Sequence, residues 1–260
     1  MTPVEVTQGD SPIILAQPHG GTFVPDAVLA RLNARGRGLD DTDWHISRLY
    51  DGLLPAASVV RATFHRYVID ANRDPEGASL YPGQNTTSLV PLTDFDGQDI
   101  WQIAPDADDI ATARRDFHAP YHAALTAEIK RVKTRHGHAI VFDCHSIRSR
   151  IPFLFDGVLP DFSIGTNMGA TCDAALARAV EEICAAAPGF SHVLNGRFKG
   201  GWTTRHYGQP ANGIHAVQLE LAQSTYMDEA APWTFRNSRA AHLRPHLGRI
   251  LTALQNWSPA

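Results

Sequence analysis

The sequence predicts an α/β fold in a single domain, with a mixed sheet flanked by helices. Short apolar runs of strand length alternate along the chain with longer segments whose apolar residues recur at helical spacing. Of the 260 residues, 43% are hydrophobic and 19% are charged, which is ordinary for a globular protein. Because no internal repeat, low-complexity segment or linker divides the chain, we expect residues 1–260 to form one domain.

The first third of the chain predicts short strands and helices. Residues 12–17 (PIILAQ) are mostly apolar, and a PHGG turn at 18–21 ends them. Asp and Thr residues at 40–43 (DDTD) suit the N-terminus of the helix that follows. Strands are predicted at 12–17, 58–62 and 67–69, and helices at 25–32 and 43–54.

The remaining two thirds begin with a long irregular segment. Residues 75–105 hold many Gly, Pro, Thr and Asp, and loops of this length in compact domains tend to be functional. Residues 106–135 place apolar side chains on one face and predict a long helix. After it, strands are predicted at 138–143, 162–166, 192–194 and 214–221, helices at 172–186 and 233–257, and a Gly-rich loop at 196–209.

Charge and cysteine usage exclude several classes of protein. The formal net charge is −4 and no dense basic cluster is present, so neither nucleic acid nor an anionic membrane is an expected partner. No apolar run approaches the roughly 20 residues that span a bilayer, and the first residues do not resemble a signal peptide. Three cysteines are too few for a disulfide framework. We therefore expect a cytoplasmic protein with reduced thiols.

Histidines follow two of the predicted buried strands, and they predict a metal site. His19 and His145 each lie at the end of an apolar run. Ligands and chemistry in α/β sheets collect beyond the carboxyl ends of the strands, and a catalytic zinc has three protein ligands. The third would be a carboxylate near His19. Asp43, at the head of the next helix, is the first choice and Asp41 the alternative, although simple helix capping would also explain Asp43. Asp143, two residues before His145, could orient that ligand.

Glu220 is the candidate general base. It lies inside an apolar predicted strand, where an unpaired glutamate would be costly to bury. Such a carboxylate is either paired for structural reasons or placed beside a site, where it could accept a proton from a water molecule.

Arginines in polar loops are the candidate substrate-binding residues. Arg73, beside Asn72, and Arg205 both lie among turn residues. The planar guanidinium matches a carboxylate with two parallel hydrogen bonds, so a substrate with one or two carboxylates would suit them. The alternative is a solvated charge or a salt bridge.

Two other classes of function stay open. Cys144, next to His145, could act as the nucleophile of a cysteine-dependent amidohydrolase, although a small buried apolar residue is the better interpretation. The same arginines could also serve a non-catalytic binding protein for acidic amino acids.

Six short segments, taken in order, carry a family resemblance that extends from about Pro12 to Trp257. They are PHGG (18–21), DTDW (41–44), DANRD (70–74), DCHS (143–146), TRHYG (204–208) and QLEL (218–221). In combination they resemble the N-formylglutamate amidohydrolase (deformylase) family. The sequence departs from the related His-x-x-Glu pattern, because Thr22 stands three residues after His19.

The resemblance implies a fold similar to zinc-dependent exopeptidases and the hydrolysis of N-formyl-L-glutamate to formate and L-glutamate, a step of histidine degradation. It implies one divalent metal ion, with zinc as the expected ion, and an N-acyl acidic amino acid as the small-molecule partner. It leaves the oligomeric state open. By this resemblance, the metal ligands are His19, Asp43 and His145, and Glu220 acts as base and then acid. The resemblance also implies that Asn72 and Arg73 bind a substrate carboxylate. Arg205 would be a second carboxylate-binding residue or would stabilise the oxyanion.

Overall fold

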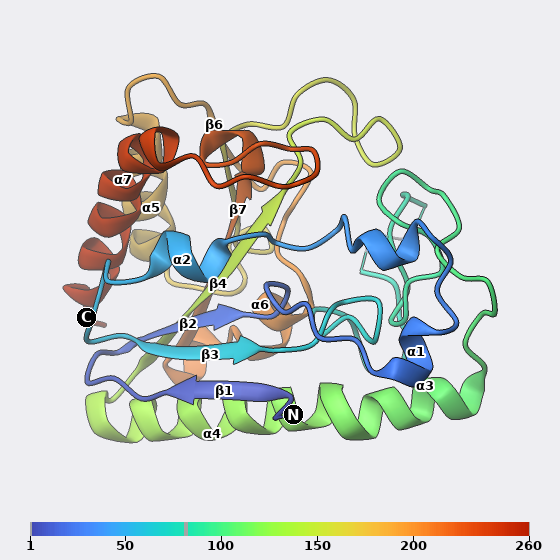
Figure 1. Cartoon of the computed structure of the whole chain (residues 1–260). Helices are drawn as coiled ribbons and strands as arrows, with labels where there is room; N and C mark the ends of the chain where they lie inside the picture. Colours follow the sequence, from blue (N-terminus) through green and yellow to red (C-terminus); the bar gives the residue numbers. More distant parts are fainter. Residues whose placement is uncertain (1, 81–82, 260) are drawn as a thin grey trace.

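The computed structural model describes residues 2–80 and 83–259, and its centre is a seven-stranded mixed sheet of order β1-β3-β2-β4-β7-β5-β6 (Figure 1). The four central strands β3, β2, β4 and β7 are parallel, whereas β1 pairs antiparallel with β3 and β5 antiparallel with β7. The predicted mixed α/β architecture is thereby confirmed. The strands are β1 (Val4–Thr7), β2 (Ile13–Gln17), β3 (Ser58–Ala62), β4 (Ala139–Ile147), β5 (Phe162–Gly165), β6 (His192–Leu194) and β7 (Ile214–Ala222).

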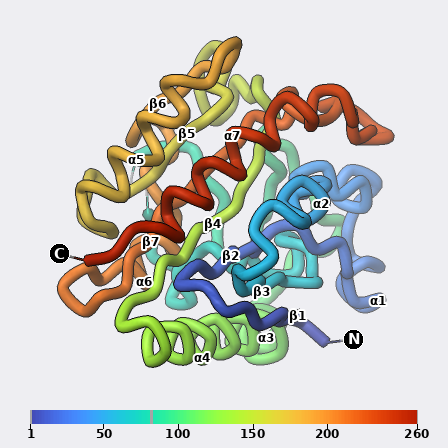
Figure 2. The backbone as a smooth tube through the Cα atoms, turned by 90° about the vertical axis from the view of Figure 1, so that its left-hand side faces the viewer, coloured from blue at the N-terminus to red at the C-terminus, as the bar shows by residue number. Residues whose placement is uncertain are grey.

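Helices cover both faces of this sheet. Figure 2 shows α5 and α7 on one side and α4 on the opposite side. One apolar cluster joins the sheet to α2, α5 and α7, and a second joins it to α4 and α6. The helices are α1 (Asp26–Leu29), α2 (Ile46–Tyr50), α3 (Ala107–Ala113), α4 (Ala119–His136), α5 (Ala174–Ala185), α6 (Trp202–Tyr207) and α7 (Asn237–Gln255), with a π-helical turn at Arg114–His118 between α3 and α4.

Strand β4 shows how the sheet separates core from site. All nine of its residues are buried, as expected for a central strand with helices on both faces. Successive side chains alternate between the faces, so Phe142 and Cys144 pack in the cluster with α5 and α7. Asp143 points to the other face, where it accepts a hydrogen bond from Thr204 of α6.

Two predicted elements were wrong. Residues 67–69 form part of a turn, because the backbone N–H of Tyr67 donates to Nδ1 of His65 and that of Val68 to the His65 carbonyl, so neither is free to pair with a strand. The predicted loop 196–209 contains α6, whose first turn is satisfied from a distance: the N–H of Thr203 donates to Oδ1 of Asn72 (2.8 Å). None of the described helices is both long and apolar enough to cross a bilayer.

Candidate active site

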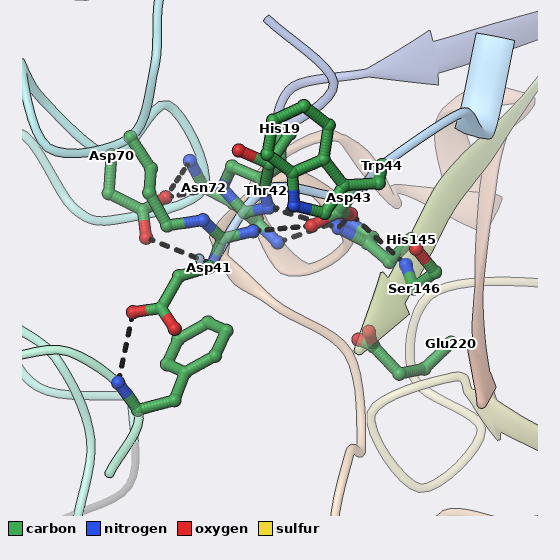
Figure 3. Close-up of polar contacts among 12 residues, drawn as sticks. His19, Asp41, Thr42, Asp43, Trp44, Asp70, Asn72, His145, Ser146 and Glu220 are labelled. Atoms are coloured by element: carbon green, nitrogen blue, oxygen red, sulfur yellow. Dashed lines mark hydrogen bonds and ion pairs between the residues drawn. The ribbon is translucent and has the colours of Figure 1, made fainter. Parts of the chain in front are cut away.

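The three predicted metal ligands meet at the carboxyl edge of the sheet (Figure 3). His19 follows β2 and His145 lies near the end of the adjacent parallel strand β4. Their Nδ1 atoms are 3.2 Å apart. Oδ2 of Asp43 lies 3.3 Å from Nδ1 of His145 and 3.9 Å from Nδ1 of His19. All three side chains are buried.

The distances among these three donor atoms fit a small divalent cation. A tetrahedral zinc with ligands at about 2.0–2.1 Å separates its donor atoms by about 3.3 Å. The outer nitrogen of each ring is close to a second carboxylate: Nε2 of His19 lies 2.6 Å from Asp70, and Nε2 of His145 lies 3.0 Å from Asp143. Such carboxylates hold the proton on Nε2 and leave the Nδ1 lone pair for a metal. His19, Asp43 and His145 could therefore hold a metal ion.

Asp43 rather than Asp41 joins the histidines. Asp43 accepts hydrogen bonds from Nη2 of Arg66 (2.6 Å) and from the backbone N–H of Ser146 (3.0 Å). Burial opposes its ionisation, but the charge of Arg66 and the two histidines hold the pKa of Asp43 below its usual value. It does not cap a helix, because α2 begins only at Ile46 and has no side-chain cap.

Asp41 instead forms hydrogen bonds with Tyr67 and with the loop that contains Phe95. Its Oδ2 accepts from the Tyr67 hydroxyl (2.8 Å) and from the backbone N–H of Phe95 (2.9 Å). Burial raises the pKa of Asp41 to about 7. In Figure 3 it lies apart from the paired histidines, and Asp43, the first choice from the sequence, lies beside them instead.

Glu220 lies directly beside His145 in the sheet. The two residues are register partners on the neighbouring parallel strands β7 and β4. Burial raises the pKa of Glu220 to about 7, against the opposing effect of His145. Nε2 of Gln218 donates to its Oε2 (3.1 Å). A carboxyl with a pKa near neutrality can both accept and return a proton at physiological pH.

A cavity opens beside these residues. His19, His145 and Glu220 form one wall. Loops form another wall, in particular residues 85–87, Phe95, Leu154 and 197–198. Three arginines line the cavity, and they are Arg66, Arg73 and Arg197.

Asn72 and Arg73, the candidate carboxylate-binding pair, line the cavity. The Asn72 backbone N–H donates to Oδ1 of Asp70 (2.8 Å), the oxygen that also contacts His19. Arg73 donates to the carbonyl oxygen (3.0 Å) and the hydroxyl (2.9 Å) of Thr87. These contacts fix the pair next to the candidate metal ligands.

Arg205 is not brought together with the other predicted site residues. It belongs to α6, and its guanidinium donates to the carbonyl oxygens of Gly200 (2.8 Å) and Leu80 (3.2 Å). It is absent from the described lining of the cavity.

Sequence reasoning missed Arg66 and Arg197. The Arg66 side chain is buried, 2.6 Å from Asp43, with its guanidinium 4.9 Å from the centre of the Phe95 ring. The available signal was an arginine directly before the apolar YVI run (67–69) and the DANRD segment. Arg197 gave no comparable signal, because its contacts come from distant loops.

The thiol of Cys144 lies on the opposite face of β4 from the cavity. It is fully buried in the apolar cluster, and burial raises its pKa well above the usual value. A reactive cysteine needs an accessible thiolate, so this environment disfavours a cysteine nucleophile.

Comparison with known proteins agrees with this geometry. The family model described as N-formylglutamate amidohydrolase matches residues 11–227. The chain is 49% identical over 253 residues to the N-formylglutamate deformylase of Pseudomonas aeruginosa, covering 96% of this chain and 95% of the relative. It is 48% identical to that of Pseudomonas putida, covering 96% and 94%.

Solved structures show the same fold. A crystal structure of an N-formylglutamate amidohydrolase from Ralstonia eutropha JMP134 superposes with a TM-score of 0.81 at 25% identity, covering 98% of this chain and 97% of that one. The gene product Atu2144 of Agrobacterium tumefaciens has a TM-score of 0.71 at 18% identity, with 98% and 97% covered. The family model spans most of the chain, and the relatives match it along nearly their whole length. This chain belongs to the N-formylglutamate amidohydrolase family.

Proposed function

We propose that this protein is a metal-dependent deformylase that hydrolyses N-formyl-L-glutamate to formate and L-glutamate, a step of histidine degradation. The observation that carries the proposal is the buried group of His19, Asp43 and His145 beside Glu220, at the wall of a cavity that arginines also line. The names of both Pseudomonas relatives support the substrate. The predicted cytoplasmic location and the single catalytic domain over residues 1–260 are parts of this proposal.

The proposed ion is Zn²⁺, because two imidazoles and one carboxylate are a ligand set that suits it. When bound, such an ion polarises the formyl oxygen and makes a water molecule more acidic. His19, Asp43 and His145 hold it, while Asp70 and Asp143 keep the two rings in position.

Glu220 moves the proton in the proposed reaction. Its carboxylate accepts a proton from the water whose oxygen attacks the formyl carbon. The same carboxyl then gives that proton to the amide nitrogen as the carbon–nitrogen bond breaks, so formate and the free amino group of glutamate leave. A pKa near 7 suits both halves of this exchange.

Charged and amide side chains orient the substrate. Asn72 and Arg73 hold the carboxylate next to the amide, which places the formyl group by the reacting water. Arg66 lines the cavity, and its Nε has no hydrogen-bond partner in the described part of the chain. We assign it to stabilising negative charge on the formyl oxygen. That Arg205 binds a second substrate carboxylate stays a prediction, which its hydrogen bonds to carbonyl oxygens do not favour.

Formate release from N-formyl-L-glutamate tests the proposal. We expect release by the purified protein, its loss on treatment with a chelator, and its return when Zn²⁺ is added. His145→Ala should lose both bound metal and activity. Formate release that survives metal removal and disappears in Cys144→Ser would instead establish the cysteine-dependent alternative. Stabilisation by glutamate without any formate release would establish a binding protein.

A further inference from the structure

We propose that Gln218 is the positioning residue of Glu220. Its amide holds one oxygen of the Glu220 carboxyl group and leaves the other oxygen to exchange protons in the cavity. This role rests on the proposed function, in which Glu220 is the base. The two residues are two positions apart on β7, so their side chains point to the same face of the sheet. Both are buried and both line the cavity.

The backbone at the start of α6 fixes the orientation of the Gln218 amide. Oε1 of Gln218 accepts a hydrogen bond from the backbone N–H of Gly201 (2.6 Å). Only the oxygen of an amide can accept from an N–H, so the NH₂ group must point away from Gly201. Gly201 is itself packed closely, because a Cβ atom built on it would lie 2.2 Å from Nδ2 of Asn72. The Gln218 amide therefore has one orientation, set from outside β7.

The NH₂ group of this amide makes the two oxygens of Glu220 unequal. Nε2 of Gln218 donates to Oε2 of Glu220 (3.1 Å), whereas Oε1 accepts no hydrogen bond from the residues that the structure describes. The unprotonated oxygen of a carboxylic acid is the better acceptor, so a proton that Glu220 takes up is favoured on Oε1. Gln218 thus assigns the anchoring role to one oxygen and the chemistry to the other.

This assignment suits the two proton transfers of the proposed reaction. Oε1 accepts a proton from the water whose oxygen attacks the formyl carbon. The same atom then gives that proton to the amide nitrogen as the carbon–nitrogen bond breaks. A carboxyl group free to rotate would spend time with neither oxygen aimed at these atoms, and holding a reacting group in one orientation lowers the barrier.

Gln218→Met tests the role, because methionine has a similar length and no amide. We expect kcat for N-formyl-L-glutamate to fall by about 10- to 100-fold, the effect of losing a hydrogen bond to a charged group. KM and the metal content, measured by elemental analysis, should stay at the wild-type values. A loss of bound metal in this variant would overturn the proposal, because Gln218 would then act on the metal site.

A double-mutant cycle with Glu220→Gln separates positioning from a general structural role. If Gln218 acts through the Glu220 carboxylate, adding Gln218→Met to Glu220→Gln should lower kcat by less than about twofold further. A further loss as large as in the wild-type background would overturn the proposal, since Gln218 would then act on the substrate or on the fold.

Two other variants complete the experiment. Gln209→Met alters an exposed glutamine just beyond α6, whose Nε2 contacts the His206 carbonyl oxygen (3.3 Å), and should keep the wild-type kcat. If Gln218→Met does not fold, Gln218→Glu replaces it in both backgrounds. That variant keeps an oxygen for Gly201 but not the NH₂ donor, so kcat should again fall only where Glu220 is present. A wild-type kcat in Gln218→Glu would mean that only the Gly201 contact matters, which contradicts the proposal.

The role of Gln218 and the proposed function fail in different ways. Wild-type protein that releases no formate from N-formyl-L-glutamate would refute the deformylase proposal, and the role of Gln218 with it. Wild-type activity combined with independent losses from the two substitutions would refute the role of Gln218 alone.

Discussion

The two walls of the cavity are built differently. The reaction wall is defined by His19, His145 and Glu220. His145 and Glu220 lie on neighbouring parallel strands in the centre of the sheet, and His19 follows the strand on the other side of β4. The recognition wall consists of loops that side-chain-to-backbone hydrogen bonds join. It is defined by residues 85–87, Phe95, Leu154 and 197–198. Groups that move protons or bind metal need fixed geometry, which strands supply. Loops can change their substrate contacts without disturbing the core.

Glu220→Gln, on the reaction wall, should have the largest effect. The amide keeps the shape and the contact with Gln218 but cannot accept a proton, so we expect kcat to fall by about 10³-fold. Metal content, measured by elemental analysis, should stay near one ion per chain. Near-normal turnover would remove Glu220 from the mechanism.

Asp70→Asn should act through the metal rather than through proton transfer. Asp70 lies 2.6 Å from Nε2 of His19, and loss of its charge should weaken metal binding by about 10- to 100-fold. Titration with a competing chelator measures this. Asp116→Asn, at an exposed pair with Arg115, is the matched control and should bind metal normally. Unchanged affinity in Asp70→Asn would show that the ring of His19 is oriented by packing alone.

His122 lies between Ala71 and Tyr207, and its burial predicts that the free energy of unfolding depends on pH. Its Nε2 lies 2.8 Å from the Ala71 carbonyl oxygen, and its Nδ1 3.0 Å from the Tyr207 hydroxyl. Burial lowers its pKa to about 3. Below pH 6.5 this histidine therefore binds a proton in the unfolded chain but not in the folded chain. The free energy of unfolding falls as pH decreases towards 3.

This contribution should amount to about 2 kcal/mol between pH 8 and pH 5. Denaturant unfolding across that range measures it. In His122→Gln the decline should be shallower than in the wild type by about that amount, since the amide does not titrate. Parallel curves for the two proteins would contradict a neutral buried His122.

Thr87→Val, on the recognition wall, should have the smallest effect. The Thr87 hydroxyl accepts from Nη2 of Arg73 (2.9 Å), and loss of one such hydrogen bond costs about 1 kcal/mol. We expect KM for N-formyl-L-glutamate to rise about fivefold, with kcat and metal content unchanged. A fall in kcat instead would mean that this loop also shapes the reaction wall.

The reaction wall could be predicted from the sequence because His19 and His145 end apolar runs. Strand alternation predicts Cys144 in the core and His145 on the other face, and the structure agrees. Glu220 stood out because a carboxylate is unusual within a buried strand.

The recognition wall could not be predicted, because its contacts join distant parts of the chain. Arg197 is held by carbonyls of residues 85 and 154, and backbone carbonyls carry no sequence signal. Asp43 and Asp41 are two residues apart in one turn, and only their contacts with distant residues separate their roles: Asp43 contacts Arg66 and Ser146, whereas Asp41 contacts Phe95. The helix α6 escaped detection for a similar reason, since Asn72 satisfies its first turn from 131 residues away.

The pairing of His145 with Glu220 across β4 and β7 also has a mechanical consequence. Nine consecutive residue pairs tie these two strands together, and neighbouring strands are spaced by about 4.8 Å. When thermal motion bends or slides the sheet, the two residues move as one body. The separation between a candidate metal ligand and the candidate general base is thus set by backbone hydrogen bonds between two strands, and fluctuations of the surrounding loops leave it unchanged.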